Sequence, residues 1–308
     1  MLAKSTKIFS EISFIIKKRK LSNFIFYSYW LHSTAITAVR LQRKFGGAAI
    51  SRVHGIDLYE ERSGGYLPYR KFLFENLDAI YPDCIKGQKY MQQKYPLYKD
   101  MFTLKYLGSN DHSVAAFERQ RDRLNIVSCS NVIPIKRIQL LARALATVDF
   151  PVKWIHFGSG SALESLSEEV ALLPENISAT LAGFTPNSDV LKYYKMHNAD
   201  VFVHCSETEG MCVSITEANS FGIPIIAADA GGVCEQVFTG KNGFLLPNDF
   251  KIEELAEKLS YFFNASDEEI AALRKGAREV WETSFQAEKN FTEFNNMLLN
   301  WEDAPRRS

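Results

Sequence analysis

The chain lacks the cysteine pattern of a disulfide-stabilised or zinc-binding protein. Its 308 residues contain five cysteines, an odd number, and they form no Cys-x-x-Cys pair. A scattered, odd set of cysteines argues against a disulfide framework and against a cysteine-rich zinc site. We therefore interpret the cysteines as small buried side chains in a protein of a reducing compartment.

The chain also lacks a long apolar run and an excess of charge of either sign. No stretch of about 18 apolar residues occurs, because Lys7, Glu11 and Lys17 interrupt the apolar N-terminal segment. We therefore expect neither a transmembrane helix nor a signal peptide, and a cytoplasmic location. The 36 basic and 36 acidic side chains balance, which disfavours binding to nucleic acid.

Charge is nevertheless unevenly distributed along the chain. Residues 1–50 contain nine basic side chains and one acidic side chain. Within them, isoleucines recur at helical spacing beside the basic cluster 17–20, at positions Ile8, Ile12, Ile15 and Ile16. A basic amphipathic helix suits peripheral contact with an anionic membrane, and it equally suits a domain helix with a solvated basic end. Both interpretations stay open.

The apolar fraction of 46% is typical of a globular protein, and the length suggests two domains. From residue 125 onward, short β-branched and aromatic runs alternate with helical patterns, which predicts an α/β fold with a parallel sheet. The expected strands lie at 125–130, 152–157, 179–182, 200–204 and 224–228, and the expected helices at 136–147, 188–197 and 212–221. A shorter set of strands, at 24–29, 48–53 and 79–81, predicts a second Rossmann-like half.

A turn-rich junction at 108–113 separates the two halves. We predict an N-terminal domain over 1–115 and a C-terminal domain over 116–283. A last helix, within 284–308, is expected to pack back on the first domain, because its apolar residues follow helical spacing. A ligand is expected in the cleft between the domains.

Two glutamates, Glu209 and Glu217, stand eight positions apart after the predicted strand that ends at His204. Gly210 permits a tight turn, and the predicted helix over 212–221 begins just after it. Free N–H groups at a helix start favour an anion, so we expect a diphosphate at Met211, Cys212, Val213 and Ser214. Glu217 would accept hydrogen bonds from ribose hydroxyls, and Glu209 would hold the hydroxyls of a sugar carried by the diphosphate.

Residues that follow neighbouring strands are expected at the same sheet edge. Lys136 follows the strand 125–130 and could neutralise charge on a departing diphosphate, with Arg137 as the second candidate. Gly158 and Gly160 end another predicted strand and would let the backbone approach a ligand closely.

Taken in order, these motifs resemble the family 4 nucleotide-sugar glycosyltransferases of the GT-B fold. The resemblance covers about residues 23 to 300 and includes the Glu209 and Glu217 pair. The other segments that carry it are 127–137, 230–235 and 242–246, with 29–31 and 51–59 similar to the acceptor-side strands of bacterial polysaccharide-assembly members.

The resemblance implies two Rossmann-like domains that face a cleft and a retaining, metal-independent transfer with no cofactor. The donor would be a nucleoside-diphosphate sugar, and the acceptor a saccharide or a lipid-linked saccharide in cell-surface polysaccharide biosynthesis. Glu209 would bind the donor sugar, Lys136 the diphosphate and Glu217 the ribose, while His54 would reach the cleft from the first domain. The leaving phosphate would itself assist the acceptor hydroxyl.

Two departures from the family pattern affect these expectations. Many members have Gly-Arg where this chain has Ser130 and Asn131, so one cationic contact is missing, and Lys136 and Arg137 would have to supply more of the positive charge. The resemblance still implies Asn131 as a donor-binding residue. Family members also begin with a strand and a glycine-rich loop that this sequence does not show. We therefore expect an incomplete first domain.

Rival functions remain at this point. A chain with a donor site and an incomplete acceptor site would be an inactive nucleotide-sugar-binding remnant. A phosphorylase or an epimerase on the same fold is a weaker alternative. The two glutamates could also be the acid and base of a glycosidase, but a hydrolase would not need a helix N-terminus directed at an anion.

Overall fold

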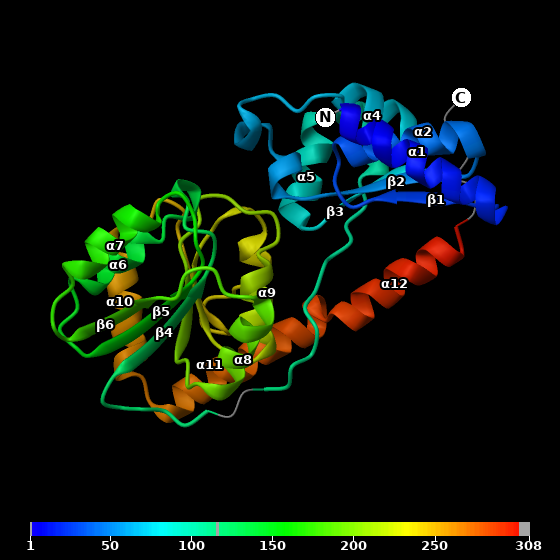
Figure 1. Ribbon diagram of the computed structural model, residues 1–308. Helices are drawn as coiled ribbons and strands as arrows, with labels where there is room; N and C mark the ends of the chain where they lie inside the picture. The colour runs from blue at the N-terminus through cyan, green and yellow to red at the C-terminus, as the bar shows by residue number, and fades with distance from the viewer. Residues whose placement is uncertain (1, 115–116, 302–308) are drawn as a thin grey trace. The chain divides into compact units, whose positions relative to one another are not determined.

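The computed structural model describes residues 2–114 and 117–301, which form two compact units (Figure 1). Unit 1 comprises the described residues up to Leu107 together with those from Lys289 onward, and unit 2 runs from Gly108 to Glu288. The first boundary falls earlier than the predicted position after residue 115 because residues 108–111 pair with unit 2. The Ser109 N–H, for example, donates to the Phe285 carbonyl at 3.0 Å.

Unit 1 is built on a parallel sheet of three strands in the order β1 (Ile25–Ser28), β2 (Ala48–Val53) and β3 (Ala79–Pro82). All three lie at the predicted positions. Its helices are α1 (Leu2–Arg19), α2 (Ser33–Phe45), α3 (Gly55–Leu58), α4 (Arg70–Asn76), α5 (Ile85–Lys94) and α12 (Ala287–Leu299), with 3₁₀ turns η1 (Glu60–Ser63) and η2 (Pro96–Met101).

Helix α12 contributes its C-terminal part to unit 1. Phe294 is buried in one core cluster with Ile50 of β2 and Tyr81 of β3. The Arg52 guanidinium lies 4.6 Å from the centre of the Phe294 ring, a cation–π contact. The last helix therefore covers the sheet of the unit with which the chain begins.

Helix α1 is a domain helix, and most of its isoleucines face the protein. Ile16 is buried, Ile8 and Ile12 are half-buried, and the buried Ser5 hydroxyl lies 2.8 Å from the Thr37 hydroxyl of α2. Among the four isoleucines that recur at helical spacing, Ile15 is the one whose side chain is exposed. The interpretation of α1 as a domain helix is therefore supported by its packing on α2, and membrane contact stays a prediction.

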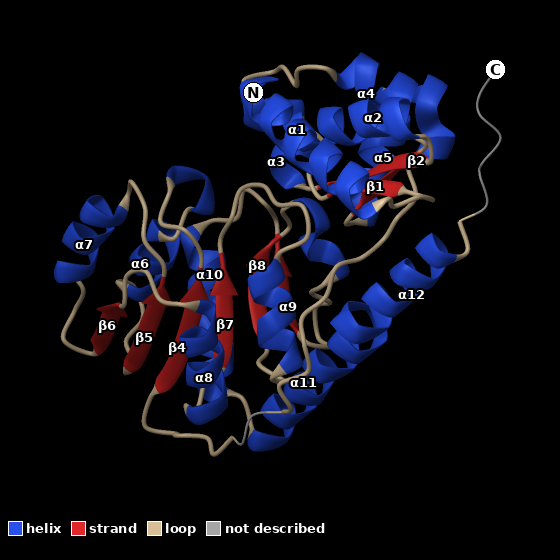
Figure 2. Ribbon diagram, turned by 45° about the vertical axis from the view of Figure 1, so that its right-hand side comes forward, coloured by secondary structure: helices blue, strands red, loops and turns tan. Residues whose placement is uncertain are grey.

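Unit 2 is a doubly wound α/β domain whose six parallel strands have the order β6-β5-β4-β7-β8-β9 (Figure 2). The strands are β4 (Leu124–Cys129), β5 (Val152–Phe157), β6 (Ile177–Leu181), β7 (Val201–His204), β8 (Ile225–Ala228) and β9 (Gly243–Leu246). The helices are α6 (Gln139–Leu145), α7 (Leu163–Ala171), α8 (Asn187–Met196), α9 (Val213–Ser220), α10 (Ile252–Asn264) and α11 (Asp267–Val280). Two more 3₁₀ turns are η3 (Pro134–Lys136) and η4 (Gly231–Glu235), and η5 (Trp281–Phe285) is a π-helical turn.

Neighbouring residues of the strands alternate between two cores, as the pleat requires. Ile126 and Val203 pack with α6 and α10, whereas Val127 and Phe202 pack with α8 and α9. Figure 2 shows α8 and α9 on one face of the sheet. Because both faces are covered, the strands read as continuous apolar runs, which is why they were predictable from the sequence.

One predicted helix of this unit is shorter than expected. The helix expected over 136–147 is present as α6, but Lys136 belongs to η3 instead, because Arg137 between them adopts a left-handed conformation with φ of 48°. A non-glycine residue with positive φ interrupts helical hydrogen bonding. Lys136 therefore lies on a short 3₁₀ turn and not at the start of a long helix.

Candidate donor site

The strand order of unit 2 reverses between β4 and β7, and ligands of doubly wound sheets bind at such a switch point, beyond the carboxyl ends of the strands. A cavity of about 380 Å³ lies there. Its walls come from the segments that follow β4, β5, β6 and β7 and from the first turns of α9. Predicted site residues that line it are Asn131, Lys136, Gly158, Glu209, Met211, Cys212, Val213, Ser214 and Glu217.

Glu209 is the centre of a buried charge network. One carboxylate oxygen, Oε1, accepts hydrogen bonds from Lys136 Nζ and from His204 Nε2, the latter at 2.9 Å. Burial opposes ionisation of Glu209, but His204 and Lys136 outweigh it and hold the pKa of this carboxyl below its usual value. Burial also works against the charged form of His204, yet Cys212 and Glu209 raise its pKa to about 9. At neutral pH Glu209 is therefore ionised and His204 is protonated.

The backbone fixes the loop that carries Glu209. Gly231 has φ of 56°, and a Cβ atom there would lie 1.8 Å from the Glu209 carbonyl oxygen. The Gly232 N–H donates to the Gly210 carbonyl at 3.0 Å. The glycine pair 231 and 232, which follows β8, thus positions the glutamate that follows β7.

Helix α9 begins at the cavity, and Gln236 anchors its start. Gln236 Nε2 donates to the Cys212 carbonyl at 2.8 Å and to Thr216 Oγ1 at 2.6 Å, while its Oε1 accepts from the Cys212 N–H at 3.0 Å. The Cys212 N–H is therefore engaged. The next N–H groups, from Val213 and Ser214, lie in the first turn, where α-helical bonding leaves donors unsatisfied.

Glu217 lies in the second turn of α9 with 9% of its surface exposed. Its Oε1 accepts a hydrogen bond from Asn187 Nδ2 at 2.9 Å, and burial raises the pKa of the carboxyl. Both residues line the cavity, as does Phe184, whose side chain is 83% exposed. This part of the cavity offers two hydrogen-bonding groups beside an accessible aromatic ring.

Arg137, Gly160 and Gly210 do not line the cavity. Arg137 Nε donates to the Cys205 carbonyl at 2.8 Å, and its Nη2 donates to Asn248 Oδ1 at 2.8 Å, so this guanidinium braces the chain after β7. A Cβ at Gly160 would lie 2.3 Å from the Val132 carbonyl oxygen, which makes this glycine necessary for chain packing. The expectation that Arg137 substitutes for Lys136 receives no geometric support.

His54 belongs to unit 1 and lies at the end of β2, before α3. Its Nδ1 is 2.9 Å from Asp83 Oδ2 and its Nε2 is 3.0 Å from the Tyr29 carbonyl oxygen. Both ring nitrogens thus have partners within the unit, and the residue is 7% exposed. Its expected role at a cleft stays a prediction.

Sequence reasoning missed several residues of the cavity. His204, which contacts Glu209, was not among the predicted site residues. Gln236, which anchors the start of α9 beside the cavity, carries no recognisable motif. The position of His204 at the carboxyl end of β7, next to the switch point, was the available signal. Other lining residues that were not predicted are Cys129, Phe157 and Ser159.

Ligand atoms of His204, Glu209 and Cys212 lie within 4.8 Å of one another, a spacing that a metal ion could bridge. Lys136 donates to the same glutamate, and an ammonium group beside this carboxylate opposes the binding of a cation. We therefore describe these residues as a charge network.

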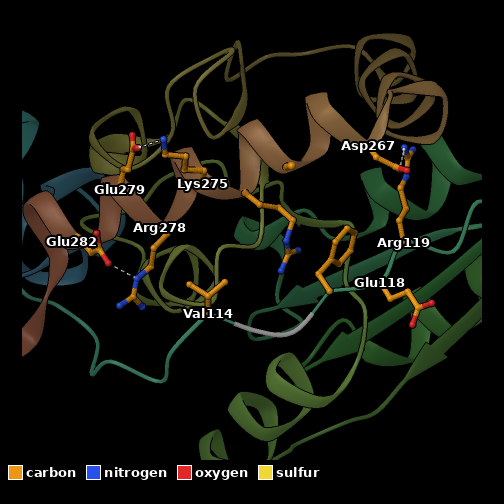
Figure 3. A pocket seen from close by; sticks show the side chains of 11 residues that line it. Val114, Glu118, Arg119, Asp267, Lys275, Arg278, Glu279 and Glu282 are labelled. Atoms are coloured by element: carbon orange, nitrogen blue, oxygen red, sulfur yellow. Dashed lines mark hydrogen bonds and ion pairs between the residues drawn. The ribbon is translucent and has the colours of Figure 1, made fainter.

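A larger cavity, of about 860 Å³, lies elsewhere in unit 2 (Figure 3). Its guanidinium groups already have partners: Arg278 pairs with Asp111 and Glu282, and Arg119 pairs with Asp267. Because most of the charges on its walls are paired and it lies away from the carboxyl ends of the strands, we do not assign it as the ligand site.

A doubly wound parallel domain with a buried acid–lysine pair and a helix N-terminus at its switch point defines an α/β protein of the Rossmann type. Residues 111–280 match the family described as Glycosyl transferases group 1. The chain belongs to this family.

Relatives and solved structures agree with this assignment. The chain is 27% identical over 284 residues to the putative colanic acid biosynthesis glycosyltransferase WcaL of Escherichia coli K12. This alignment covers 85% of this chain and 67% of WcaL. It is 29% identical to the O-antigen biosynthesis glycosyltransferase WbnH of E. coli over 49% of this chain and 42% of that protein.

Among solved structures, Staphylococcus aureus TarM in complex with fondaparinux, α-GlcNAc-glycerol and UDP superposes with a TM-score of 0.71 at 19% identity. The superposition covers 87% of this chain and 59% of TarM. The predicted GT-B fold and the predicted membership of a glycosyltransferase family are therefore confirmed. The chain spans between about two fifths and two thirds of the length of these proteins.

Proposed function

We propose that this chain transfers a sugar from a nucleoside-diphosphate sugar to a saccharide acceptor in cell-surface polysaccharide synthesis. The observation that carries the proposal is the cavity at the switch point, where Lys136, Glu209 and Glu217 converge with the start of α9. The names of WcaL and WbnH support the polysaccharide class, and the UDP bound to TarM supports the donor class.

Different residues of the cavity would bind different parts of the donor. The first turn of α9 and Lys136 would bind the diphosphate, Glu217 with Asn187 the ribose, and Phe184 would stack on the base. Glu209, held by Lys136 and His204, would accept hydrogen bonds from sugar hydroxyls.

This arrangement also supports a metal-independent reaction. Negative charge grows on the diphosphate as the sugar leaves, and Lys136, charged His204 and the α9 N-terminus lie where they can stabilise it. We further propose retention of the anomeric configuration, with the leaving phosphate oxygen accepting the proton of the acceptor hydroxyl. His54 is kept as the proposed acceptor-side residue.

Nucleotide binding tests the proposal most directly. We expect calorimetric titration of the whole chain with UDP, GDP and ADP to show binding of at least one. Replacing Glu217 by Ala should weaken that binding about tenfold, because the ribose hydroxyls lose a charged acceptor. Unchanged affinity in this variant would contradict the placement of the ribose.

Donor turnover then separates a transferase from an inactive remnant. Slow release of sugar from the matching donor, with water as acceptor, is expected of a working enzyme. Binding without any release would favour the nucleotide-sugar-binding remnant.

We also propose that the enzyme makes peripheral contact with the cytoplasmic face of a membrane. Within the described residues, no helix is long and apolar enough to cross a membrane. However, the end of α1 exposes Phe14 and Ile15, at 65% and 46%, and Leu21 follows at 49%, beside the exposed basic cluster 17–20. Apolar side chains next to clustered cations suit the surface of an anionic bilayer and a lipid-linked acceptor.

We expect replacement of Lys17, Lys18, Arg19 and Lys20 by Ala to weaken binding to phosphatidylserine vesicles by tenfold or more, since each cation near the surface contributes about 1 kcal/mol. Co-sedimentation measures the effect. A matched control removes four exposed lysines from other elements: Lys89, Lys195, Lys251 and Lys275. Equal binding by the two variants would refute a local membrane surface.

A further inference from the structure

Cys212 occupies an unusual position inside the donor cavity. It is the residue immediately before α9, it lines the cavity, and it is 5% exposed. Its Sγ lies 3.5 Å from His204 Nε2 and 3.3 Å from Ser214 Oγ. The sulfur thus has an imidazole and a hydroxyl within contact distance at a helix N-terminus.

The charged groups around Cys212 favour its ionised form. His204 of β7 and Lys136 of η3 are the facing cations, and Glu209 is the facing anion. Burial raises the pKa of the Cys212 thiol, but His204 outweighs burial and brings the pKa below its ordinary value. The N-terminus of α9 adds a favourable dipole.

A second cysteine of the same cavity behaves in the opposite way. Cys129, at the end of β4, also lines the cavity, but burial and the nearby Glu217 raise its pKa to about 12. Cys205, buried next to His204, has its pKa raised to about 12 by burial. Burial in this part of the protein therefore does not by itself lower the pKa of a thiol. The side-chain contact with His204 distinguishes Cys212 from Cys129 and Cys205.

We propose that Cys212 is a nucleophilic thiolate paired with the His204 imidazolium, a modification site for small electrophiles whose occupation closes the donor cavity. With iodoacetamide, the sulfur electron pair forms the C–S bond, the C–I bond breaks, and iodide leaves. With a peroxide, the S–O bond forms as the O–O bond breaks, so the sulfur is oxidised to sulfenic acid and the peroxide is reduced to hydroxide. The second half of this proposal, closure of the cavity, rests on the proposed donor function.

Site-resolved labelling tests the thiolate without any nucleotide. The whole chain is treated with limiting iodoacetamide, and each cysteine is quantified in its own peptide by mass spectrometry. We expect Cys212 to react at least ten times faster than Cys129 at pH 7. Between pH 8 and pH 6.5 its rate should fall much less than the roughly 20-fold expected for a thiol of pKa about 8.5.

The variant His204→Asn should slow the labelling of Cys212 about tenfold at pH 7. A Cys212 that reacts no faster than Cys129, or a folded His204→Asn protein with an unchanged rate, overturns the thiolate. If that variant does not fold, the pH profile of the unaltered chain decides, and an ordinary 20-fold fall overturns the proposal.

Calorimetry with UDP, GDP and ADP tests the closure of the cavity. Labelling should abolish binding of whichever nucleotide the untreated chain binds, whereas Cys212→Ser, compared with its own untreated sample, should keep its affinity after treatment. Full labelling of Cys212 with retained binding overturns closure. Absence of nucleotide binding in the untreated chain overturns the donor function instead, since the labelling rates are measured without nucleotide.

Discussion

Replacement of Glu209 by Gln is expected to lower donor turnover about 100-fold, the usual cost of removing one preorganised group that stabilises a transition state. The amide keeps the shape of the side chain but removes the charge that holds Lys136 and His204. The pKa of His204 should fall as a result, and two of the cations that face the diphosphate lose their fixed positions. Sugar release from the donor, measured with saturating donor, gives this number.

Nucleotide affinity separates a positioning effect from loss of the site. Glu209 is expected to contact the sugar and not the nucleotide, so the affinity for UDP, GDP or ADP should change less than about tenfold. Glu207→Gln is the matched control, because Glu207 is an exposed acid on the same loop, whose backbone N–H donates to the Ile135 carbonyl. Its turnover should stay within about twofold of the unaltered chain, and equal turnover in both variants would contradict the assignment of Glu209.

The sheet of unit 2 was predictable because burial on two faces leaves a simple sequence signature. Strands β4, β5, β7 and β8 read as apolar runs with turn residues between them, and the structure places all four within about a residue of the prediction. The division of the predicted helix at Arg137 was not predictable in this way. A left-handed arginine depends on tertiary contacts of its guanidinium with Cys205 and Asn248, which lie far along the chain.

The candidate site was predictable where a residue acts through its distance from a strand end. Lys136, Glu209 and Glu217 follow β4 and β7, and the parallel topology alone brings them together. Gln236 and His204 act through contacts with α9 and with Glu209 that no local pattern encodes. For Gly160 the expectation from the sequence differed from the structure. This glycine was expected to let a ligand approach the backbone, but it allows close packing against the Val132 backbone instead.

Gly231 is the backbone position on which the geometry of Glu209 depends most. Its φ of 56° strains any other residue, and a Cβ atom would lie 1.8 Å from the Glu209 carbonyl oxygen, a backbone atom that cannot rotate away. We expect Gly231→Ala to lower the free energy of unfolding by about 3 kcal/mol or more, from conformational strain and overpacking together. Urea denaturation followed by tryptophan fluorescence measures it, since Trp154 and Trp281 are fully buried in unit 2.

Gly240→Ala separates the two causes. Gly240 also has positive φ, 80°, but a Cβ there would meet nothing within 4 Å, so only the conformational strain of about 1 kcal/mol is expected. Equal destabilisation by the two variants would show that strain alone explains Gly231. If the contact with the Glu209 carbonyl matters, Gly231→Ala must also displace the loop that carries Glu209. Donor turnover by this variant should then fall even under conditions where it is fully folded. Turnover by Gly240→Ala should not fall under the same conditions. Gly231, which follows β8, would then determine the position of Glu209, which follows β7. This dependence arises because the fold brings the two segments together at one edge of the sheet.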